Sequence, residues 1–178
     1  QDLWNALTKA SNVNVSAAMA SFLDQPGVPL VTVTVRPGGK VSLSQTRYAF
    51  AGLPAPQKQL WRIPVTLRYA TAGGIKQRTV LLEKPQLELS LAPGEELLWI
   101  HPNADERGYY RWSLDAAGLA RLTSARESLS LRERMGLGYA LASQLGAGTL
   151  SGDAVLQSLG GLTNDSHPRV VASSLSAI

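Results

Sequence analysis

The chain has 178 residues, two histidines, no cysteine and a formal net charge of +4. Without cysteine it has no disulfide framework, no thiol nucleophile and no cysteine-ligated zinc or iron–sulfur cluster. Its histidines, His101 and His167, lie far apart and each precedes a proline, so they do not form the helical pair that binds zinc. Hydrophobic residues make up 44% and charged residues 17% of the chain, a balance that indicates a folded core and excludes a disordered protein.

The first 25 residues predict a helical hairpin. Apolar residues recur on one helix face between positions 3 and 10 and again between 15 and 23. Asn14 is placed to cap the second helix, and a Gln-Pro-Gly sequence at 25–27 ends it. Two such short helices cannot bury a core of their own, so we expect them to pack against something else.

From 26 to about 117 the apolar period falls to two, which is typical of strands. Glycine and proline turns separate seven candidate strands, at 30–35, 41–45, 61–69, 77–82, 87–91, 97–100 and 109–114. Short strands at this spacing, with no helix between them, predict an Ig-like antiparallel β-sandwich. Trp61 and Tyr109, each with its neighbours on the same strand, are expected to fill the core because aromatic side chains bury large apolar areas.

The remaining segment, 118–178, predicts short paired helices. Ser130 and Glu133 have the Ser-x-x-Glu spacing of a capping box, in which each side chain satisfies a free backbone amide at a helix start. Ser151 is placed to cap a second helix, and Asp165 or Ser166 a third that runs to the end of the chain. The pattern resembles the beginning of a longer helical array.

Positive charge is concentrated in one part of the chain. No acidic residue lies between Asp24 and Glu83, whereas eight basic residues do: Arg36, Lys40, Arg47, Lys58, Arg62, Arg68, Lys76 and Arg78. Such a stretch could contact a polyanion, or it could be the solvated face of a sheet. We favour the solvated face and expect no nucleic-acid partner, because the stacking aromatic pattern of RNA-binding strands is missing.

We find no motif that predicts catalysis. Gly148 to Gly152 resembles a nucleophile elbow, but Ser151 is one position too late and no strand precedes it. The Glu95-Glu96 pair follows a turn and is expected to face water, and His101 is expected to be a structural residue at a strand end. We therefore predict no catalytic, cofactor-binding or metal-ligating residue, and we expect that this chain alone is not an enzyme.

Several segments are informative because of the order in which they occur. They are QPGVPLVTV at 25–33, LSQTRY at 43–48, WRIPV at 61–65, Asn103 followed by Gly-Tyr-Tyr-Arg at 108–111, and SLRERMGL at 130–137. This set resembles the gluzincin zinc aminopeptidases related to aminopeptidase N. The resemblance implies three regions: a helical tail of the catalytic domain (1–25), a β-sandwich domain (26–117) and the start of a C-terminal helical domain (118–178). The fold class expected is mainly β with flanking helices.

The resemblance also implies a function. The zinc-binding and catalytic motifs of the family belong to segments before Gln1, so none is carried onto a residue of this chain. The chain would be a non-catalytic spacer that positions the helical cap over the active site of a parent enzyme, which would cleave N-terminal residues from peptides. No cofactor is expected in this chain, and zinc is expected in the parent catalytic domain.

The partners expected are the catalytic domain and the remaining helical domain, with peptide substrate contacted only indirectly. A homodimer through the terminal helices is possible, and no membrane span is expected. The absence of cysteine and of a signal segment favours the cytoplasm. The alternative is a free-standing β-sandwich module that binds a polyanion, a carbohydrate or a protein. An N-terminal helical hairpin has no evident purpose in such a module.

Overall fold

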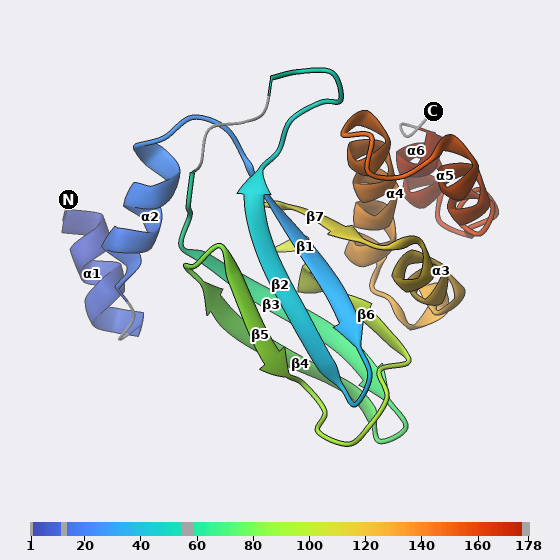
Figure 1. The fold of residues 1–178 in the computed structure, drawn as a ribbon, viewed down its shortest axis with the longest axis horizontal. Helices are drawn as coiled ribbons and strands as arrows, with labels where there is room; N and C mark the ends of the chain where they lie inside the picture. The colour runs from blue at the N-terminus through green and yellow to red at the C-terminus, as the bar shows by residue number, and fades with distance from the viewer. Residues whose placement is uncertain (1, 12–13, 55–58, 176–178) are drawn as a thin grey trace.

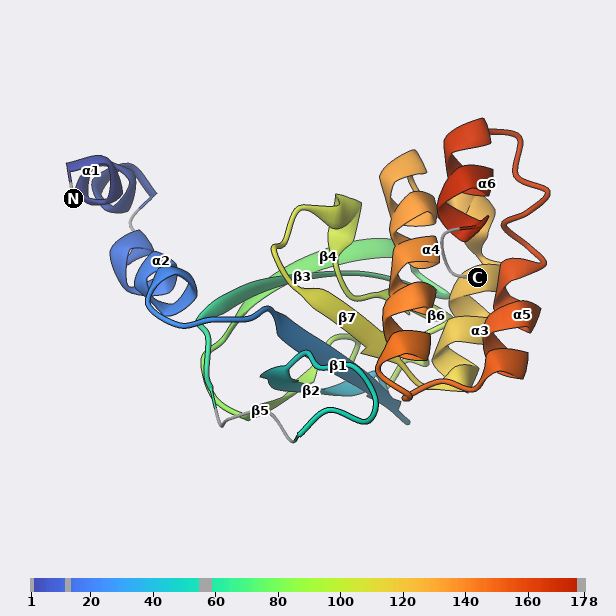
Figure 2. The same ribbon diagram turned by 90° about the horizontal axis from the view of Figure 1, so that it is seen from above.

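The computed structural model describes residues 2–11, 14–54 and 59–175. A β-sandwich lies in the centre, two N-terminal helices extend from one end, and four C-terminal helices cover the other side (Figures 1 and 2). The predicted fold class, a β-sandwich with flanking helices, is confirmed. Lys58 and the predicted end of the last helix, at 176–178, lie outside the described residues.

The sandwich consists of a four-stranded sheet, β5-β2-β1-β7, and a three-stranded sheet, β4-β3-β6. The strands are β1 (Pro29–Arg36), β2 (Lys40–Arg47), β3 (Ile63–Thr71), β4 (Gly74–Leu82), β5 (Gln86–Ser90), β6 (Trp99–His101) and β7 (Arg111–Leu114). All seven overlap the strands predicted from the sequence. One described pairing departs from the antiparallel arrangement, because β7 returns beside β1 and runs parallel to it after the chain has alternated between the sheets.

Aromatic and aliphatic side chains fill the space between the sheets. Trp61 is fully buried, as predicted. The side chain of Gln45, on β2, is also buried; its oxygen accepts the Trp61 amide hydrogen at 2.8 Å and its nitrogen donates to the Trp61 carbonyl at 2.9 Å. The prediction that the strand around Tyr109 fills the core is confirmed for Tyr110 and Trp112 but wrong for Tyr109 itself, which is 73% exposed. Strand β7 begins at Arg111, two residues after Tyr109.

The N-terminal helices are α1 (Asp2–Ser11) and α2 (Val15–Leu23). The predicted cap is confirmed, because the Asn14 side chain accepts the Ala17 amide hydrogen at 3.0 Å. Although α2 is rich in apolar residues, none of its residues is buried. The hairpin of α1 and α2 extends away from the sandwich (Figure 2).

The C-terminal helices are α3 (Ala116–Ser124), α4 (Leu131–Gly146), α5 (Gly152–Leu159) and α6 (Pro168–Leu175). Helix α3 was not predicted as a separate element; Asp115 caps it by accepting the Gly118 amide hydrogen at 2.6 Å. Within the described residues, no helix is long and apolar enough to cross a membrane.

Two of the predicted C-terminal caps are confirmed and one was wrong. Ser130 and Glu133 form the capping box of α4, and Ser151 caps α5. At α6 the capping acceptor is His167, whose Nδ1 accepts the Arg169 amide hydrogen at 3.2 Å. Asp165 instead accepts the His167 amide hydrogen just before the helix.

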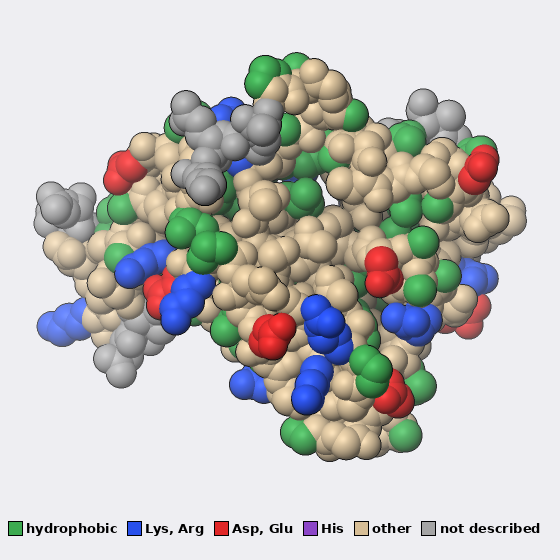
Figure 3. All heavy atoms as spheres, in the orientation of Figure 1, with side chains coloured by type: hydrophobic (Ala, Val, Ile, Leu, Met, Phe, Trp, Pro, Cys, Tyr) green, Lys and Arg blue, Asp and Glu red, His purple; other side chains and the backbone are tan. Residues whose placement is uncertain are grey.

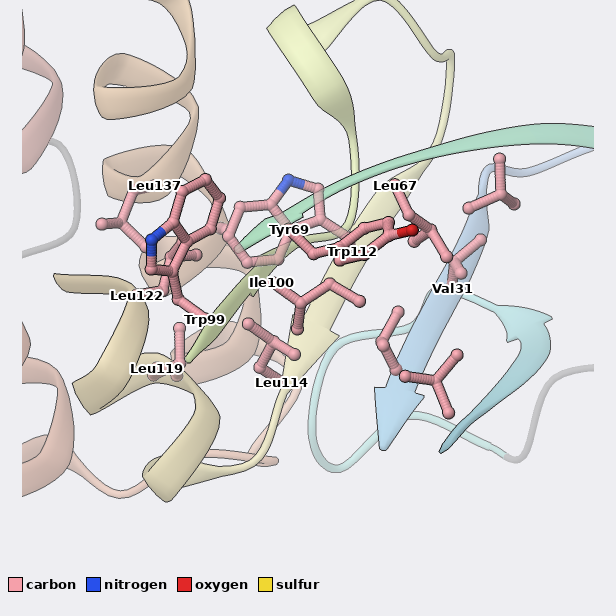
Figure 4. Packing of buried hydrophobic residues seen from close by; sticks show 14 of the residues in the cluster. Val31, Leu67, Tyr69, Trp99, Ile100, Trp112, Leu114, Leu119, Leu122 and Leu137 are labelled. Carbon is pink, nitrogen blue, oxygen red and sulfur yellow. The ribbon is translucent and has the colours of Figure 1, made fainter. Parts of the chain in front are cut away.

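One hydrophobic cluster runs from the sandwich into the C-terminal helices. Figure 4 shows Trp99 and Ile100 of β6 between the sheet residues and the leucines of α3 and α4. Leu119, Leu122 and Leu137 are all almost fully buried there. Since close-packed interiors resist sliding, the sandwich and the C-terminal helices form one body.

Candidate functional site

Polar side chains converge where helix α4 meets the sandwich, and we call this group the joint cluster. It combines residues from β3, from β6 and the loop after it, from the short 3₁₀ helix η1 (Ala104–Glu106) and from the start of α4. Its members are Arg68, His101, Asn103, Asp105, Glu106, Ser130 and Glu133. Buried polar and charged groups require hydrogen bonds or opposite charges, so the contacts within this cluster decide whether the joint is stable.

Glu133 is the centre of the joint cluster, and its side chain is only 1% exposed. One oxygen accepts from the Arg68 guanidinium and from the Ser130 amide, the latter at 2.8 Å. The other accepts from the Asp105 amide at 3.1 Å. A single carboxylate therefore ties β3, η1 and α4 together, while it also completes the capping box.

Arg68 extends the same network across the surface of the sandwich. Its second terminal nitrogen donates to the Ser128 carbonyl at 3.0 Å, and its guanidinium lies 5.6 Å from the ring centroid of Trp99. A planar guanidinium can form a charged pair, a hydrogen bond and a ring contact at once, which a lysine ammonium does less well. This position therefore favours arginine.

The 3₁₀ helix η1 has a strained backbone. Asp105 and Glu106 have φ values of 58° and 52°, in the left-handed region that non-glycine residues seldom adopt. Each such residue costs about 1 kcal/mol or more, which the hydrogen bonds of the joint cluster must offset. Gly136 of α4 permits the arrangement, because a Cβ atom there would lie 2.1 Å from the Glu106 carboxylate.

The Asp105 side chain faces the outer side of the joint. It accepts from the Ser130 hydroxyl at 3.0 Å, and Arg107 and Arg132 approach it at 3.1 and 3.8 Å. The Ser130 hydrogen bond is the main cause that lowers the pKa of the Asp105 carboxyl group, and the two arginines lower it further. Asp105 is therefore charged in the joint.

Glu106 points inward, and burial raises its pKa to about 7. Hydrogen bonds from Trp112 Nε1 and Asn103 Nδ2, both at 3.1 Å, oppose that rise, whereas the negative charge of Glu133 adds to it. His101, at the end of β6, is fully buried and lies 3.4 Å from Glu106. Burial lowers its pKa to about 4, so at neutral pH the imidazole is uncharged.

A second polar contact joins the sandwich to the far end of α4. The Arg111 guanidinium lies 4.3 Å from the ring centroid of Tyr48 and donates to the Ser143 hydroxyl. The Tyr48 hydroxyl donates to the Ser143 carbonyl at 3.1 Å. Helix α4 is thus held at both ends, which fixes its direction as well as its position.

The sequence did not predict the joint cluster as a unit. It identified the capping pair Ser130 and Glu133, and it placed His101 at a strand end, where the structure has it. It could not show that Arg68 and Glu106 meet these residues, because the four segments are far apart in the chain. The local signal in the sequence was the capping box itself, because the Glu133 carboxylate in it can accept further hydrogen bonds.

The other residues considered in the sequence have structural contacts. Glu95 lies 3.5 Å from Lys76, and Glu96 accepts the Gly38 amide hydrogen at 3.0 Å. Ser151 accepts the Ala154 amide hydrogen at 3.3 Å as a helix cap. None of these contacts places a base beside a nucleophile.

Several basic side chains from residues 25–82, the stretch without acidic residues, form ion pairs with carboxylates from other segments. Arg62 lies 3.5 Å from Glu83, and Lys76 and Arg68 pair with Glu95 and Glu133. On the face shown in Figure 3, basic and acidic side chains are interspersed. This pairing lowers the local positive charge and weakens the support for a polyanion-binding module.

The joint cluster does not fit a zinc ion. Among the described residues, no group of three or more His, Asp and Glu side chains is placed to hold a metal. His101 and Glu106 supply two potential ligands, and the nearby Glu133 carboxylate is already engaged by Arg68 and two amides. The expectation that this chain binds no cofactor stays a prediction.

Comparison with known proteins finds relatives that match most of this chain. The chain is 34% identical to aminopeptidase M1 of Arabidopsis thaliana over 144 residues, which is 74% of this chain. It is 29% identical over 159 residues, 85% of the chain, to the puromycin-sensitive aminopeptidase of Caenorhabditis elegans. It is also 29% identical over 170 residues, 96% of the chain, to the tricorn protease-interacting factor F2 of Thermoplasma acidophilum.

The chain belongs to the aminopeptidase N-like family. No protein-family model matches it. The chain spans 16% of the length of the Arabidopsis and Caenorhabditis aminopeptidases and 20% of the Thermoplasma protein. The matched region is thus a small part of each relative.

Proposed function

We propose that this chain is a non-catalytic part of a zinc-dependent aminopeptidase and that it holds a helical domain at a fixed position relative to the catalytic domain. The three regions would be 1–25, 26–117 and 118–178. The observation that carries the proposal is the single hydrophobic core shared by the sandwich and the C-terminal helices. A spacer must hold the two domains it connects at a fixed relative position. A shared close-packed core meets that requirement because it resists bending.

Exposed apolar side chains support further partners for this chain. Leu23 at the end of α2 is 66% exposed, and Leu175 at the end of α6 is 58% exposed. Phe50 and Leu53, in the loop after β2, are about equally exposed. Helices α2 and α6 lie at opposite ends of the molecule (Figure 2), so Leu23 and Leu175 would each meet a different partner. We propose that the catalytic domain and the remaining helical domain cover them, with peptide substrate contacted only indirectly.

The non-catalytic role is tested on the purified chain. We expect no stoichiometric zinc binding by metal analysis after dialysis and no hydrolysis of an aminoacyl anilide. Turnover by pure material that a chelator abolishes would contradict the proposal. The homodimer remains a separate prediction, which light scattering across a concentration series checks.

The spacer role is tested in a full-length parent that carries this segment. Leu137→Ala weakens the shared core, and Leu156→Ala is the matched control because that side chain is 59% exposed. We expect the first variant to raise kcat/KM for long peptides relative to an aminoacyl anilide, since a loosened helical domain restricts access less. An unchanged ratio in a folded Leu137→Ala enzyme would exclude the spacer role while leaving the family assignment intact.

A further inference from the structure

Most of the phenylalanine and tyrosine side chains stay outside the core. The chain has two phenylalanines and five tyrosines, all of which the structure describes, and only Tyr69 and Tyr110 among them are buried. Three of the others are strongly exposed: Tyr109 by 73%, Phe50 by 59% and Tyr139 by 53%. Because aromatic rings carry a large apolar area, exposed rings that gather on one surface indicate a contact with another body.

Contacts between neighbouring side chains join these residues into one strip. At its first end, the centroid of the Phe22 ring of α2 lies 6.2 Å from that of Tyr109. Exposure alternates from Tyr109 to Trp112, so Tyr109 and Arg111 both face away from the core. The Arg111 guanidinium lies 4.3 Å from the centroid of the Tyr48 ring. The strip therefore runs from the N-terminal hairpin to the loop after β2.

The loop after β2 continues the strip to helix α4 (Figure 1). The ring centroids of Tyr48 and Phe50 are 5.5 Å apart. The Ala51 amide donates to the Gly146 carbonyl at 2.8 Å, and a Cβ atom on Gly146 would lie 3.1 Å from the Phe50 ring. Tyr139 precedes Gly146 by about two helical turns and so lies on the same face of α4. We call the six side chains of this surface the aromatic strip: Phe22, Tyr109, Arg111, Tyr48, Phe50 and Tyr139.

The aromatic strip carries a positive charge without an acidic partner. Arg111 is exposed, and among the described residues its guanidinium contacts the Tyr48 ring and the Ser143 hydroxyl but no carboxylate. Tyrosine, phenylalanine and arginine are enriched where proteins meet one another, and tyrosine and arginine often supply much of the binding energy. A nucleic acid would need several cations for its phosphates, whereas the strip has one. The strip therefore fits a protein surface that offers apolar pockets to the rings and a carboxylate to Arg111.

We propose that the aromatic strip is the docking surface for the catalytic domain of the parent enzyme. This inference rests on the proposed function, which assigns residues 1–25 to that domain. Because the strip begins at Phe22 of the hairpin, a domain continuous with the hairpin lies next to it. The chain spans 16% or 20% of the relatives reported above, so most of each relative lies outside the matched region. A domain docked there contacts the hairpin, the sandwich and α4 together, which fixes their relative positions.

A second copy of this chain is a poorer partner for the strip. Two copies in a two-fold contact would use the same surface of each. The strip contains no acidic residue, so a second strip would bring no carboxylate to Arg111 and would place another cation on the same surface. Like charges at a contact oppose association.

The proposal is tested by comparing the same rings in two forms of the protein. Hydroxyl-radical footprinting read by mass spectrometry should find Tyr109, Phe50 and Tyr139 reactive in the isolated chain. In a full-length parent that carries this segment, their rates of modification should fall about tenfold, as the fully buried core of an interface implies. Ile75 of β4, which is 50% exposed and lies outside the strip, is the control and should react equally in both forms. Rings that react equally in both forms, or equal protection of Ile75, would overturn the proposal.

The same measurement separates failure of the docking surface from failure of the proposed function. If the strip stays reactive in a parent whose preference for long peptides responds to Leu137→Ala, only the docking surface is wrong. If the strip is protected but that preference does not respond, the docking surface stands and the spacer role is wrong. Protection that appears in the isolated chain as its concentration rises would assign the strip to a second copy and contradict the proposal.

Reversal of the charge tests the expected carboxylate. In the full-length parent, Arg111→Glu should raise the modification rate of Tyr109 on the order of tenfold, because two carboxylates would then face each other. Arg36→Glu is the matched control, since Arg36 is also exposed and lies at the end of β1, outside the strip. Thermal unfolding of the isolated Arg111→Glu chain checks that it folds. Equal footprints of the two variants would overturn the assignment of a carboxylate to Arg111, and the footprint of the unaltered parent tests the docking surface without any variant.

Discussion

The two helical regions of this chain differ in how they meet the sandwich. The C-terminal helices share the hydrophobic core of the sheets, and α4 is also held by the joint cluster. Among the residues that the structure describes, the N-terminal hairpin contacts the sandwich through a few groups. The Ser21 hydroxyl accepts the Arg62 amide hydrogen at 3.0 Å, Gln25 donates to the Leu60 carbonyl at 2.8 Å, and the Phe22 and Tyr109 rings lie 6.2 Å apart.

Composition alone therefore does not decide whether a helix is buried. Helix α2 contains almost only apolar and small residues, yet none of them is buried. Helix α4 is more polar and contributes Leu137 and Leu141, both fully buried, to the shared core. The C-terminal helices are therefore part of the body of the protein, whereas no residue of α2 is buried.

The largest expected effect comes from the shared core. Leu137→Ala removes a fully buried side chain and should lower the free energy of unfolding by about 3 kcal/mol. If the sandwich and the C-terminal helices form one body, they should still unfold in a single transition in this variant. Leu156→Ala is the exposed control and should change stability by less than about 0.5 kcal/mol. Separate transitions for tryptophan fluorescence and helical circular dichroism in the unaltered chain would refute the single body.

Loss of the central carboxylate should have the next largest effect. Glu133→Gln preserves the shape of the capping residue but leaves the partly buried Arg68 without its charged partner, at a cost of about 2 kcal/mol. Glu83→Gln removes the partner of Arg62 in a pair of which both side chains are more than 40% exposed, and should cost less than about 0.5 kcal/mol. Equal effects of the two changes in urea unfolding would mean that the joint cluster contributes no more than a surface pair.

A close approach between helices predicts a smaller effect. A Cβ atom on Gly138 would lie 2.8 Å from the Ser173 carbonyl oxygen of α6, so Gly138→Ala should push these helices apart and destabilise the chain by about 1 kcal/mol. Gly152→Ala, at the start of α5, meets no atom within 4 Å and is the matched control. Because alanine favours helix over glycine, the control should be neutral or stabilising. Thermal unfolding of both variants checks the opposite signs.

The smallest effect is expected from removal of the hairpin. A chain that begins at Gln25 loses α1 and α2, of which only the partly buried Phe22, among the described residues, packs against the shared core. Its urea midpoint should stay close to that of the complete chain, and its solubility should rise because the exposed apolar side chains of α2 are removed. A loss of stability comparable to that of Leu137→Ala would show that the hairpin belongs to the same body.

Local rules predicted most elements and failed where distant segments meet. Asn14, Ser130 and Ser151 cap their helices as predicted, because a cap depends on residues within one turn. The position of Tyr109 was predicted wrongly, since strand alternation does not tell where a strand begins. The order of motifs was sufficient to suggest the family, because that order is a property of the chain and not of its packing.

The sequence by itself determined the approximate positions of the seven strands, the caps of α2, α4 and α5, and the resemblance to the aminopeptidase N-like family. Periodicity, caps and motif order are all local or sequential. Only the tertiary structure decided which helices share the core of the sheets and which stay exposed. It also decided the burial of His101 and, in large part, of Glu106, which lowers the pKa of the first and raises the pKa of the second. Burial and the distance between charges set a pKa, and neither exists until segments far apart in the chain have packed together.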